Sequence, residues 1–280
     1  MTLALSVSAC SLVATGYNNG PRLMVFTWID PHLDLTRDQE RQVLADLTQI
    51  QAWHRQQQLP LYQQWLKQMQ TLAPHNIQAA QVCKLFDEMR DSLTTVAAKF
   101  EEPTARLALS LQSPQFVVLK KRFEKDNQQW RKDWSLNGSA EDQLDAQTDK
   151  GQDNAEMVYG RLDRSQKALL RQLAKDSGFD SVKTAQERLR QQSDAMQVLQ
   201  TIASKQPPVR EATALVHDWF ERSLHTPDEA YAAYLRKRQE LNCEAAATFH
   251  NTTTAAQREH AIKVLKGYED DVRQLMRAPG

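Results

Sequence analysis

The sequence predicts an all-α protein, built as an elongated antiparallel multi-helix bundle of about eight or nine helices. Three observations carry this prediction: glycine is scarce, helix-start signals recur along the chain, and apolar residues repeat at helical spacing. Only 8 of the 280 residues are glycine, which is less than half the usual proportion of about 7%. Because nucleotide-binding α/β folds and β-sandwiches depend on frequent turns, many of them glycine-rich, the deficit counts against both.

Composition and charge exclude further classes of protein. The 35 Lys and Arg side chains balance 35 Asp and Glu side chains, so the formal net charge is zero. A nucleic-acid-binding protein usually carries a basic excess that displaces counterions from phosphates, so no nucleic-acid partner is expected. Hydrophobic residues make up 41% of the chain, which is enough for a folded core. No apolar run reaches the ~20 residues that a bilayer-spanning helix requires.

Helix-start signals divide the chain into nine predicted helices. Thr36 and Gln39 have the spacing of a capping box, as do Thr254 and Gln257. Proline suits the first turn of a helix, where its missing N–H group costs no hydrogen bond, and Pro60 has this position. The predicted helices cover residues 37–58, 60–72, 77–101, 113–135, 139–176, 180–205, 208–224, 226–250 and 254–276.

Apolar periodicity supports the same helices. Residues 82 to 100 alternate steps of four and three between apolar positions, which places one apolar stripe along a helix. Its members are Val82, Phe86, Met89, Leu93, Val96 and Phe100. A short extended piece is expected only at residues 24–26. The polar stretch 141–160 is either an exposed helix end or a mobile loop, and Gly160, alone within a helical pattern, predicts a kink.

The first fourteen residues carry no charged side chain and have the apolar character of a signal-peptide hydrophobic region. Within them, Val7-Ser8-Ala9-Cys10 resembles the bacterial lipobox, in which small residues precede the cysteine. That resemblance implies that the Cys10 thiol carries a diacylglycerol and that the new N-terminus is acylated, for example by palmitate. Ser11 stands where an aspartate would favour inner-membrane retention, so the resemblance implies the periplasmic face of the outer membrane.

The N-terminus departs from a complete signal peptide in one respect. Only nine residues precede Cys10 and none is basic, so either the true start lies upstream or the cleavage interpretation does not apply. The alternative is a buried N-terminal strand or helix with an incidental cysteine. The lipoprotein interpretation divides the chain into a signal-peptide remnant, a lipidated tether with a short flexible spacer, and a helical domain. These cover residues 1–9, 10–20 and 21–280, the last either whole or as two sub-bundles joined near 136–160.

The three cysteines of the sequence are Cys10, Cys83 and Cys243. An odd number in an exported protein leaves one cysteine without a disulfide partner, and lipidation of Cys10 would account for it. Cys83 and Cys243 would then form a disulfide in the oxidising periplasm, closing a long loop of the chain. The alternative is two buried free thiols at contacts between helices.

The sequence contains no motif for catalysis or metal binding. Its seven histidines are scattered, and it lacks HExxH, zinc-spaced cysteines, a GxSxG nucleophile elbow and a phosphate-binding loop. Paired carboxylates such as Glu101-Glu102 are typical of the solvated face of an amphipathic helix. We therefore expect no catalytic residue, no metal site and no cofactor.

Aromatic segments near the N-terminus are candidates for a binding surface. Tryptophan and tyrosine beside asparagine, histidine and arginine can line a groove. The alternative is that the rings pack at the edge of the core with their polar tips in water. The residues concerned are Tyr17, Asn18, Trp28, Asp30, Trp53, His54, Arg55 and Tyr62.

Several of these residues also carry a family resemblance. After the lipobox the sequence contains Tyr17-Asn18-Asn19, Trp28-Ile29-Asp30, Asp34-Leu35-Thr36 with Gln39, Trp53-His54-Arg55, Leu59-Pro60 with Tyr62, Phe249-His250-Asn251, and Thr254 with Gln257-Arg258. Together these resemble a family of uncharacterised Gram-negative lipoproteins, a domain of unknown function. The resemblance implies a helical protein of the outer membrane facing the periplasm, and it implies no activity. Leu35-Thr36-Arg37-Asp38-Gln39 also resembles the LTxxQ form of small periplasmic stress chaperones.

The leading hypothesis is a lipid-anchored, non-enzymatic protein that binds another envelope protein or a misfolded chain, with Cys10 as the attachment to the membrane. One alternative is a hydrolase-type enzyme with a groove near Trp53, His54 and Arg55, which a buried His54 paired with a carboxylate would favour. The other alternative is a purely structural lipoprotein.

Overall fold

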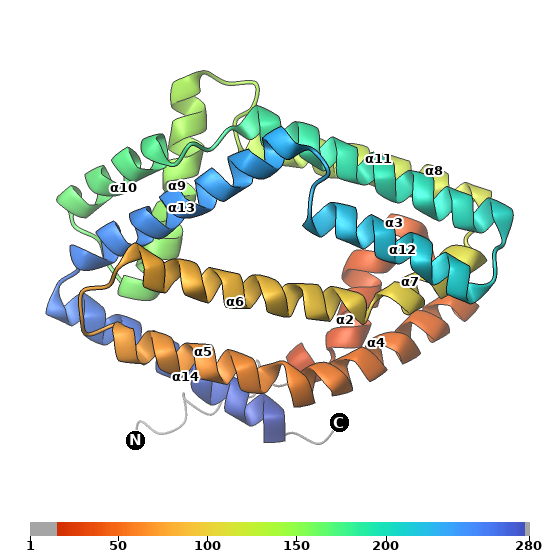
Figure 1. Ribbon diagram of the computed structural model, residues 1–280, viewed down its shortest axis with the longest axis horizontal. Helices are drawn as coiled ribbons and strands as arrows, with labels where there is room; N and C mark the ends of the chain where they lie inside the picture. Colours follow the sequence, from red (N-terminus) through yellow and green to blue (C-terminus); the bar gives the residue numbers. More distant parts are fainter. Residues whose placement is uncertain (1–15, 278–280) are drawn as a thin grey trace.

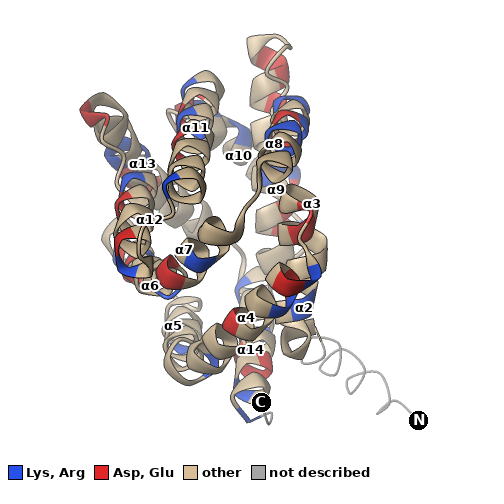
Figure 2. Cartoon of the chain, turned by 90° about the vertical axis from the view of Figure 1, so that its right-hand side faces the viewer, with Lys and Arg blue, Asp and Glu red and all other residues tan. Residues whose placement is uncertain are grey.

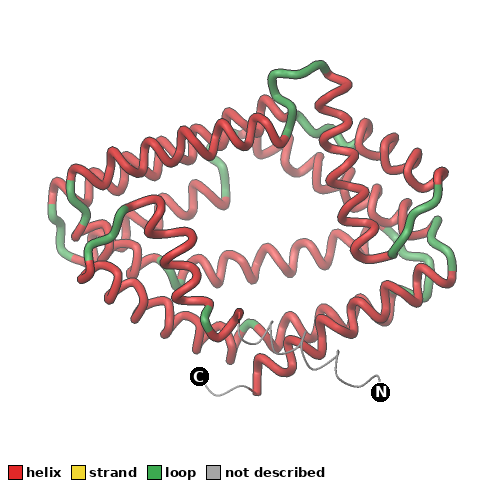
Figure 3. The backbone as a smooth tube through the Cα atoms, turned by 180° about the vertical axis from the view of Figure 1, so that it is seen from behind, coloured by secondary structure: helices red, strands yellow, loops and turns green. Residues whose placement is uncertain are grey.

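The computed structural model describes residues 16–277 and contains helices and no strand over that range (Figure 3). The all-α prediction is confirmed, whereas the thirteen α-helices and one π-helix exceed the eight or nine helices expected. The elements are α2 (Gly20–Met24), η1 (Val25–Ile29), α3 (Asp30–Leu33), α4 (Arg37–Gln57), α5 (Leu59–Leu72), α6 (Ala79–Ala98), α7 (Glu101–Ser110), α8 (Ser113–Asp133), α9 (Ala140–Tyr159), α10 (Arg164–Asp176), α11 (Ser181–Lys205), α12 (Val209–Leu224), α13 (Glu229–Asn251) and α14 (Ala255–Arg277).

The expectation of an extended piece at residues 24–26 is wrong, because this segment is helical. Proline stands in the first turn of α2 and again in that of α3, where a missing N–H group is tolerated. Pro21, Val25 and Leu33 are buried at intervals of four or eight residues, which is the spacing of one helix face. Asp34 ends the segment with a left-handed backbone conformation, at φ 50°.

The other two additional helices, α7 and α10, appear where a predicted helix ends early. The helix predicted over 139–176 is two helices, because Gly160 takes a φ of +72° that ends α9 and Asp163 caps the start of α10. The helix predicted over 77–101 ends earlier, where Lys99 and Phe100 donate backbone hydrogen bonds to residues three positions back and close the last turn of α6. α7 follows as a separate helix in a region for which none was predicted.

The helices pack in pairs whose members are often far apart in the sequence. α5 packs against α14, α6 against α13, α7 against α12, and α9 against α10. In Figure 1 the helices form a lens-shaped outline, with α4, α5 and α14 along the lower side and α8 and α11 along the upper right, and α6 runs across the middle. The polar stretch 141–160 lies mostly within α9, which packs against α10 and α14.

The apolar core is divided into three clusters of buried side chains. The largest joins α7, α8, α11 and α12 around residues such as Ala105, Ile202 and Val216. A second cluster, made of Val25, Val43 and Leu47, fixes the N-terminal helices to α4. The third surrounds Phe249 of α13, where it meets the end of α9 and the start of α10.

Lys and Arg positions are interspersed with Asp and Glu positions along the helices, as the blue and red segments of the chain in Figure 2 show. This distribution accords with the zero net charge of the sequence. Among the described residues, none of the helices combines the length and apolar character needed to cross a bilayer.

Candidate functional site

Two tyrosines enclose the imidazole of His54. The hydroxyl of Tyr17 lies 3.0 Å from His54 Nδ1, and the hydroxyl of Tyr62 lies 3.3 Å from His54 Nε2. His54 stands in the last turn of α4, and α5 returns alongside from Leu59 with Tyr62 in its first turns. The site therefore joins the N-terminal segment to the corner between α4 and α5.

Burial controls the protonation of this cluster. It lowers the pKa of His54 below its usual 6.5. It also raises the pKa of Tyr17 above 10.0, although the nearby Arg55 acts in the opposite direction. Both shifts favour the neutral form of the side chain. The two hydrogen-bond partners of His54 are hydroxyl groups, whereas a catalytic histidine of a hydrolase is usually oriented by a carboxylate.

Further bonds from α4 hold the same segment. Arg55 donates to Asn18 Oδ1 at 2.9 Å, and its guanidinium lies 5.5 Å from the centre of the Tyr17 ring. The side-chain amide of Gln51 donates to the carbonyl oxygen of Tyr17. We call this group the tether clamp; its residues are Tyr17, Asn18, Gln51, His54, Arg55 and Tyr62.

The structure thus brings together five of the eight residues proposed for a binding surface and separates the other three. Trp28 is 66% exposed, and its ring lies 5.3 Å from that of His32. Asp30 accepts the backbone N–H of Leu35 at 2.8 Å and so stabilises the turn before α4. Trp53 lies under the ammonium group of Lys99, 5.1 Å from its ring centre. Within this group, His54 and Arg55 bind Tyr17 and Asn18, which belong to the chain's own N-terminal segment. These two residues stand near the end of the tether expected over residues 10–20.

An apolar pocket of about 310 Å³ lies beside the tether clamp. The N-terminal segment forms one wall, and residues of α4, α6 and the turn after α6 form the others. Aliphatic and aromatic side chains dominate its surface, and Tyr17, Gln51 and His54 of the tether clamp also line it. Its lining residues include Pro21, Met24, Leu47, Ile50, Val96 and Phe100.

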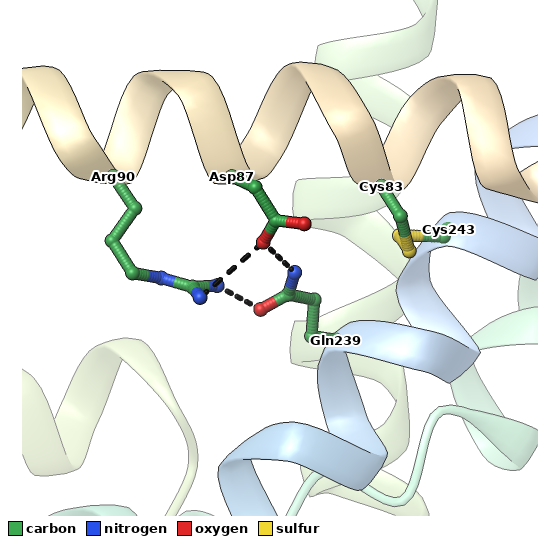
Figure 4. Close-up of a disulfide and its surroundings, with 5 residues drawn as sticks. All are labelled: Cys83, Asp87, Arg90, Gln239 and Cys243. Carbon is green, nitrogen blue, oxygen red and sulfur yellow. Dashed lines mark hydrogen bonds and ion pairs between the residues drawn. A yellow bond between two sulfur atoms is a disulfide. The ribbon is translucent and has the colours of Figure 1, made fainter.

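A disulfide joins Cys83 of α6 to Cys243 of α13, across 160 positions of sequence and with a Cα–Cα distance of 5.4 Å. One turn away on each helix, Gln239 donates to Asp87 Oδ1 at 2.8 Å, and Arg90 bonds to both of these residues (Figure 4). The covalent bond and the polar contacts lie on the same interface between the two helices.

A buried histidine, His250, lies at the C-terminal end of α13. His250 Nε2 lies 2.8 Å from the carbonyl oxygen of His75, so this nitrogen is the donor and Nδ1 accepts from the Tyr159 hydroxyl at 2.8 Å. Burial lowers the pKa of His250, in keeping with the neutral tautomer. Asn251 exchanges two hydrogen bonds with the backbone of Ile77, each 2.9 Å long. These residues of the family resemblance therefore hold the loop before α6.

An open groove of about 680 Å³ runs between α8 and α11. Aromatic and aliphatic side chains alternate in it with amides and a few charged groups. Sequence reasoning did not identify it; one helix face is recognisable from spacings of three and four along α8, but nothing in the sequence indicates that α11 lies opposite. Residues lining the groove include Phe116, Lys120, Phe123, Asn127, Leu189, Gln192 and Met196.

Within residues 16–277, no three His, Cys, Asp or Glu side chains come close enough to hold a metal ion. The proposed lipidation site, Cys10, lies outside the described residues.

Comparison with known proteins gives one match. The model of a family of unknown function, DUF6279, matches residues 31–228. No curated protein and no solved structure matches the chain.

Proposed function

We propose that this chain, which belongs to the DUF6279 family of unknown function, is a lipid-anchored envelope protein. In this proposal Cys10 carries the lipid, and the protein is attached to the periplasmic face of the outer membrane. The helical body acts as a binding protein for a segment of another envelope protein and catalyses no reaction.

The disulfide between Cys83 and Cys243 is the observation that supports this proposal most strongly. Stable disulfides are typical of exported proteins, because the cytosol keeps thiols reduced. The sequence has three cysteines, so the bond leaves Cys10 as the remaining one. Cys10 is also the cysteine that follows the lipobox-like residues, which makes an attachment role the simplest account of it.

The tether clamp also supports attachment to the membrane through Cys10. Tyr17 is seven residues after Cys10, a stretch that spans at most about 25 Å when fully extended. Because Tyr17 and Asn18 are bonded to α4, a lipid on Cys10 would keep the helical body close to the membrane surface. A loose N-terminal segment would allow the body to move much further away.

The groove between α8 and α11 supports the binding role. The open sides of this groove of about 680 Å³ suit a protein segment, whereas small-molecule sites bury most of the surface of their ligand. Apolar anchors such as Phe123 and Met196 can take apolar side chains, and amides such as Gln192 can bond to a backbone.

Metabolic labelling tests the lipid anchor. Cells producing the full-length protein are grown with an alkyne analogue of palmitate, and membrane fractions are analysed for label. We expect label in the outer membrane for the parent, loss of label for Cys10→Ser, and retained label with a shift to the inner membrane for Ser11→Asp. Label that persists in Cys10→Ser would contradict the proposal.

Site-specific photo-crosslinking in intact cells tests the binding role. A photoreactive residue replaces Leu189 in the groove, and Leu235 on α13 is the matched control, since both side chains are exposed. We expect a discrete protein adduct from position 189 and none from position 235. Equal adducts, or none from position 189, would contradict a binding role for the groove.

A further inference from the structure

The N-terminal helices expose an unusual set of large apolar side chains. Leu23, Met24, Phe26 and Trp28 are 48%, 41%, 48% and 66% exposed. We call these four residues the N-terminal apolar face. On the opposite side of the same segment, Val25 is buried in the cluster that contacts α4.

This concentration distinguishes the face from ordinary surface residues. Single exposed hydrophobic side chains are normal, whereas contiguous ones mark a site of interaction. Of the fourteen exposed large hydrophobic residues of the described range, ten are spread over eight helices, whereas four fall within six positions here. No charged residue occurs between Arg22 and Asp30. The local sequence therefore supplies apolar area and a tryptophan, with charge only at its two ends.

The position of the face relative to the tether clamp indicates what covers it. Leu23 lies six residues after Tyr17, which is roughly 9 Å along a helical path. Tyr17 in turn lies no more than about 25 Å from Cys10 along the chain. A bilayer that holds a lipid on Cys10 would thus lie within reach of Leu23, Phe26 and Trp28.

We propose that the N-terminal apolar face lies in the interfacial layer of the membrane to which Cys10 is anchored. Tryptophan is enriched at that depth because its ring is apolar and its indole N–H can still bond to headgroups or water. Arg22, at the start of the face, can contact lipid phosphates. This inference rests on the proposed lipid anchor, and it adds a second point of attachment that would fix the orientation of the helical body.

A second attachment point has a physical reason. The acyl chains on Cys10 would already attach the protein stably, but attachment at one point leaves the helical body free to turn about the tether. The tether clamp makes the apolar face rigid relative to the body, because residues 17 and 18 are bonded to α4 and Val25 is packed against it. Membrane contact at this face would therefore restrict the direction in which the groove between α8 and α11 faces relative to the membrane.

Vesicle binding of the full chain carrying Cys10→Ser tests the face without the lipid. Sucrose-loaded vesicles of phosphatidylethanolamine and phosphatidylglycerol are sedimented with the protein. We expect measurable binding that falls about tenfold when Phe26→Ser and Trp28→Ser are added. Val182→Ser with Val209→Ser is the matched control, since these side chains are also exposed, and it should leave binding unchanged.

Lipid-depth quenching gives a second measurement on the same protein. Brominated lipid should quench tryptophan fluorescence in the Cys10→Ser protein but not after Trp28→Phe. Absence of vesicle binding, or binding insensitive to the serine substitutions, would overturn the inference and leave a protein partner as the occupant of the face. The labelling of Cys10 is a separate readout, so failure of the anchor and failure of the face are distinguishable.

Discussion

The side-chain amides of Gln166 and Gln257 hydrogen-bond to each other in both directions, at 2.8 and 2.9 Å. Each oxygen also accepts the backbone N–H of its own helix cap, from Asp163 at 3.1 Å and from Thr254 at 3.0 Å. Gln166 and Gln257 therefore each complete the capping box of their own helix, and the bonds between them join the start of α10 to the start of α14.

The same arrangement occurs at the other end of the molecule. Gln39 and Gln115 exchange amide hydrogen bonds of 3.2 and 2.9 Å, and their oxygens accept from Thr36 and Gln112. All four glutamines stand three residues after a helix cap. Only an amide can do this, because it offers two acceptor sites on oxygen and two donors on nitrogen.

The first prediction concerns the amide group of Gln257. Glutamate is as good as glutamine in a capping box, so capping alone predicts little change for Gln257→Glu. The side-chain amide of Gln257 also donates to Gln166 and to the Arg161 carbonyl, and glutamate cannot replace this donor. We therefore expect a loss of about 1–3 kcal/mol in the free energy of unfolding. Urea unfolding measures the loss.

The control for this substitution is Gln81→Glu. Gln81 completes the capping box of α6 at an exposed site, where it accepts the Gln78 N–H at 2.8 Å. We expect Gln81→Glu to be close to neutral. If the two glutamate substitutions cost the same, the amide pair adds nothing to stability.

These pairs illustrate what sequence could and could not predict about the fold. The boxes at Thr36 and Thr254 were predicted from spacing, because capping depends on residues three positions apart. The pairing of Gln39 with Gln115 spans 76 positions and depends on which helix starts meet, so no local pattern reveals it. The break at Gly160 was anticipated as a kink, but the new start at Asp163 was not.

The second prediction concerns the disulfide. Replacing both cysteines, Cys83→Ser with Cys243→Ser, should lower the free energy of unfolding by up to about 5 kcal/mol, because the bond closes a loop of 160 positions in the unfolded chain. Urea unfolding with and without reductant should show that the reduced protein behaves like the double variant. Cys10→Ser is the control and should unfold as the parent does. A double variant as stable as the parent would contradict this account.

The third prediction concerns pH dependence at Glu269, a buried carboxylate between α5 and α14. The pKa of Glu269 is lowered from 4.5 to about 2, chiefly because Gln70 donates to it, with Arg273, Lys266 and Gln63 adding further hydrogen bonds. A carboxylate with a lowered pKa contributes stability that is complete above pH 4.5 and is lost as pH falls towards 2.

Glu269→Gln should therefore be less stable than the parent at pH 7, by about 1–3 kcal/mol. The difference should shrink as pH falls from 4.5 to 2, as followed by urea unfolding at a series of pH values. Glu240→Gln, at an exposed residue paired with Lys237, is the control and should show little effect. A constant difference across this range would argue against a charged Glu269 in the folded state.

The fourth prediction concerns the tether clamp. His54→Ala removes the partner of Tyr17 and should speed hydrogen exchange of the amides in residues 19–29 by roughly tenfold, through local opening. Exchange in α11 should not change. Arg41→Ala, at an exposed residue of the same helix, should leave exchange at the N-terminus as it is. Unchanged exchange in His54→Ala would show that the clamp does not hold the segment.

The sequence predicts most of the residues that form the candidate site but not what they bind. The sequence predicts Tyr17, His54, Arg55 and Tyr62 as part of a binding surface because aromatic side chains stand beside asparagine, histidine and arginine, and these four residues lie together. His54 and Arg55 bind Tyr17 and Asn18 of the chain's own N-terminal segment. No property of the individual residues could indicate this contact. Trp28 was grouped with them by residue type alone, and its separate position follows from the helical path through η1.

The lipid anchor is tested most directly by the mass of the N-terminal peptide of the protein extracted from its own membranes. We expect a peptide that begins at Cys10 and carries a diacylglycerol with an additional amide-linked acyl chain. A peptide that reads through Ala9-Cys10-Ser11 with an unmodified thiol would contradict the lipid anchor.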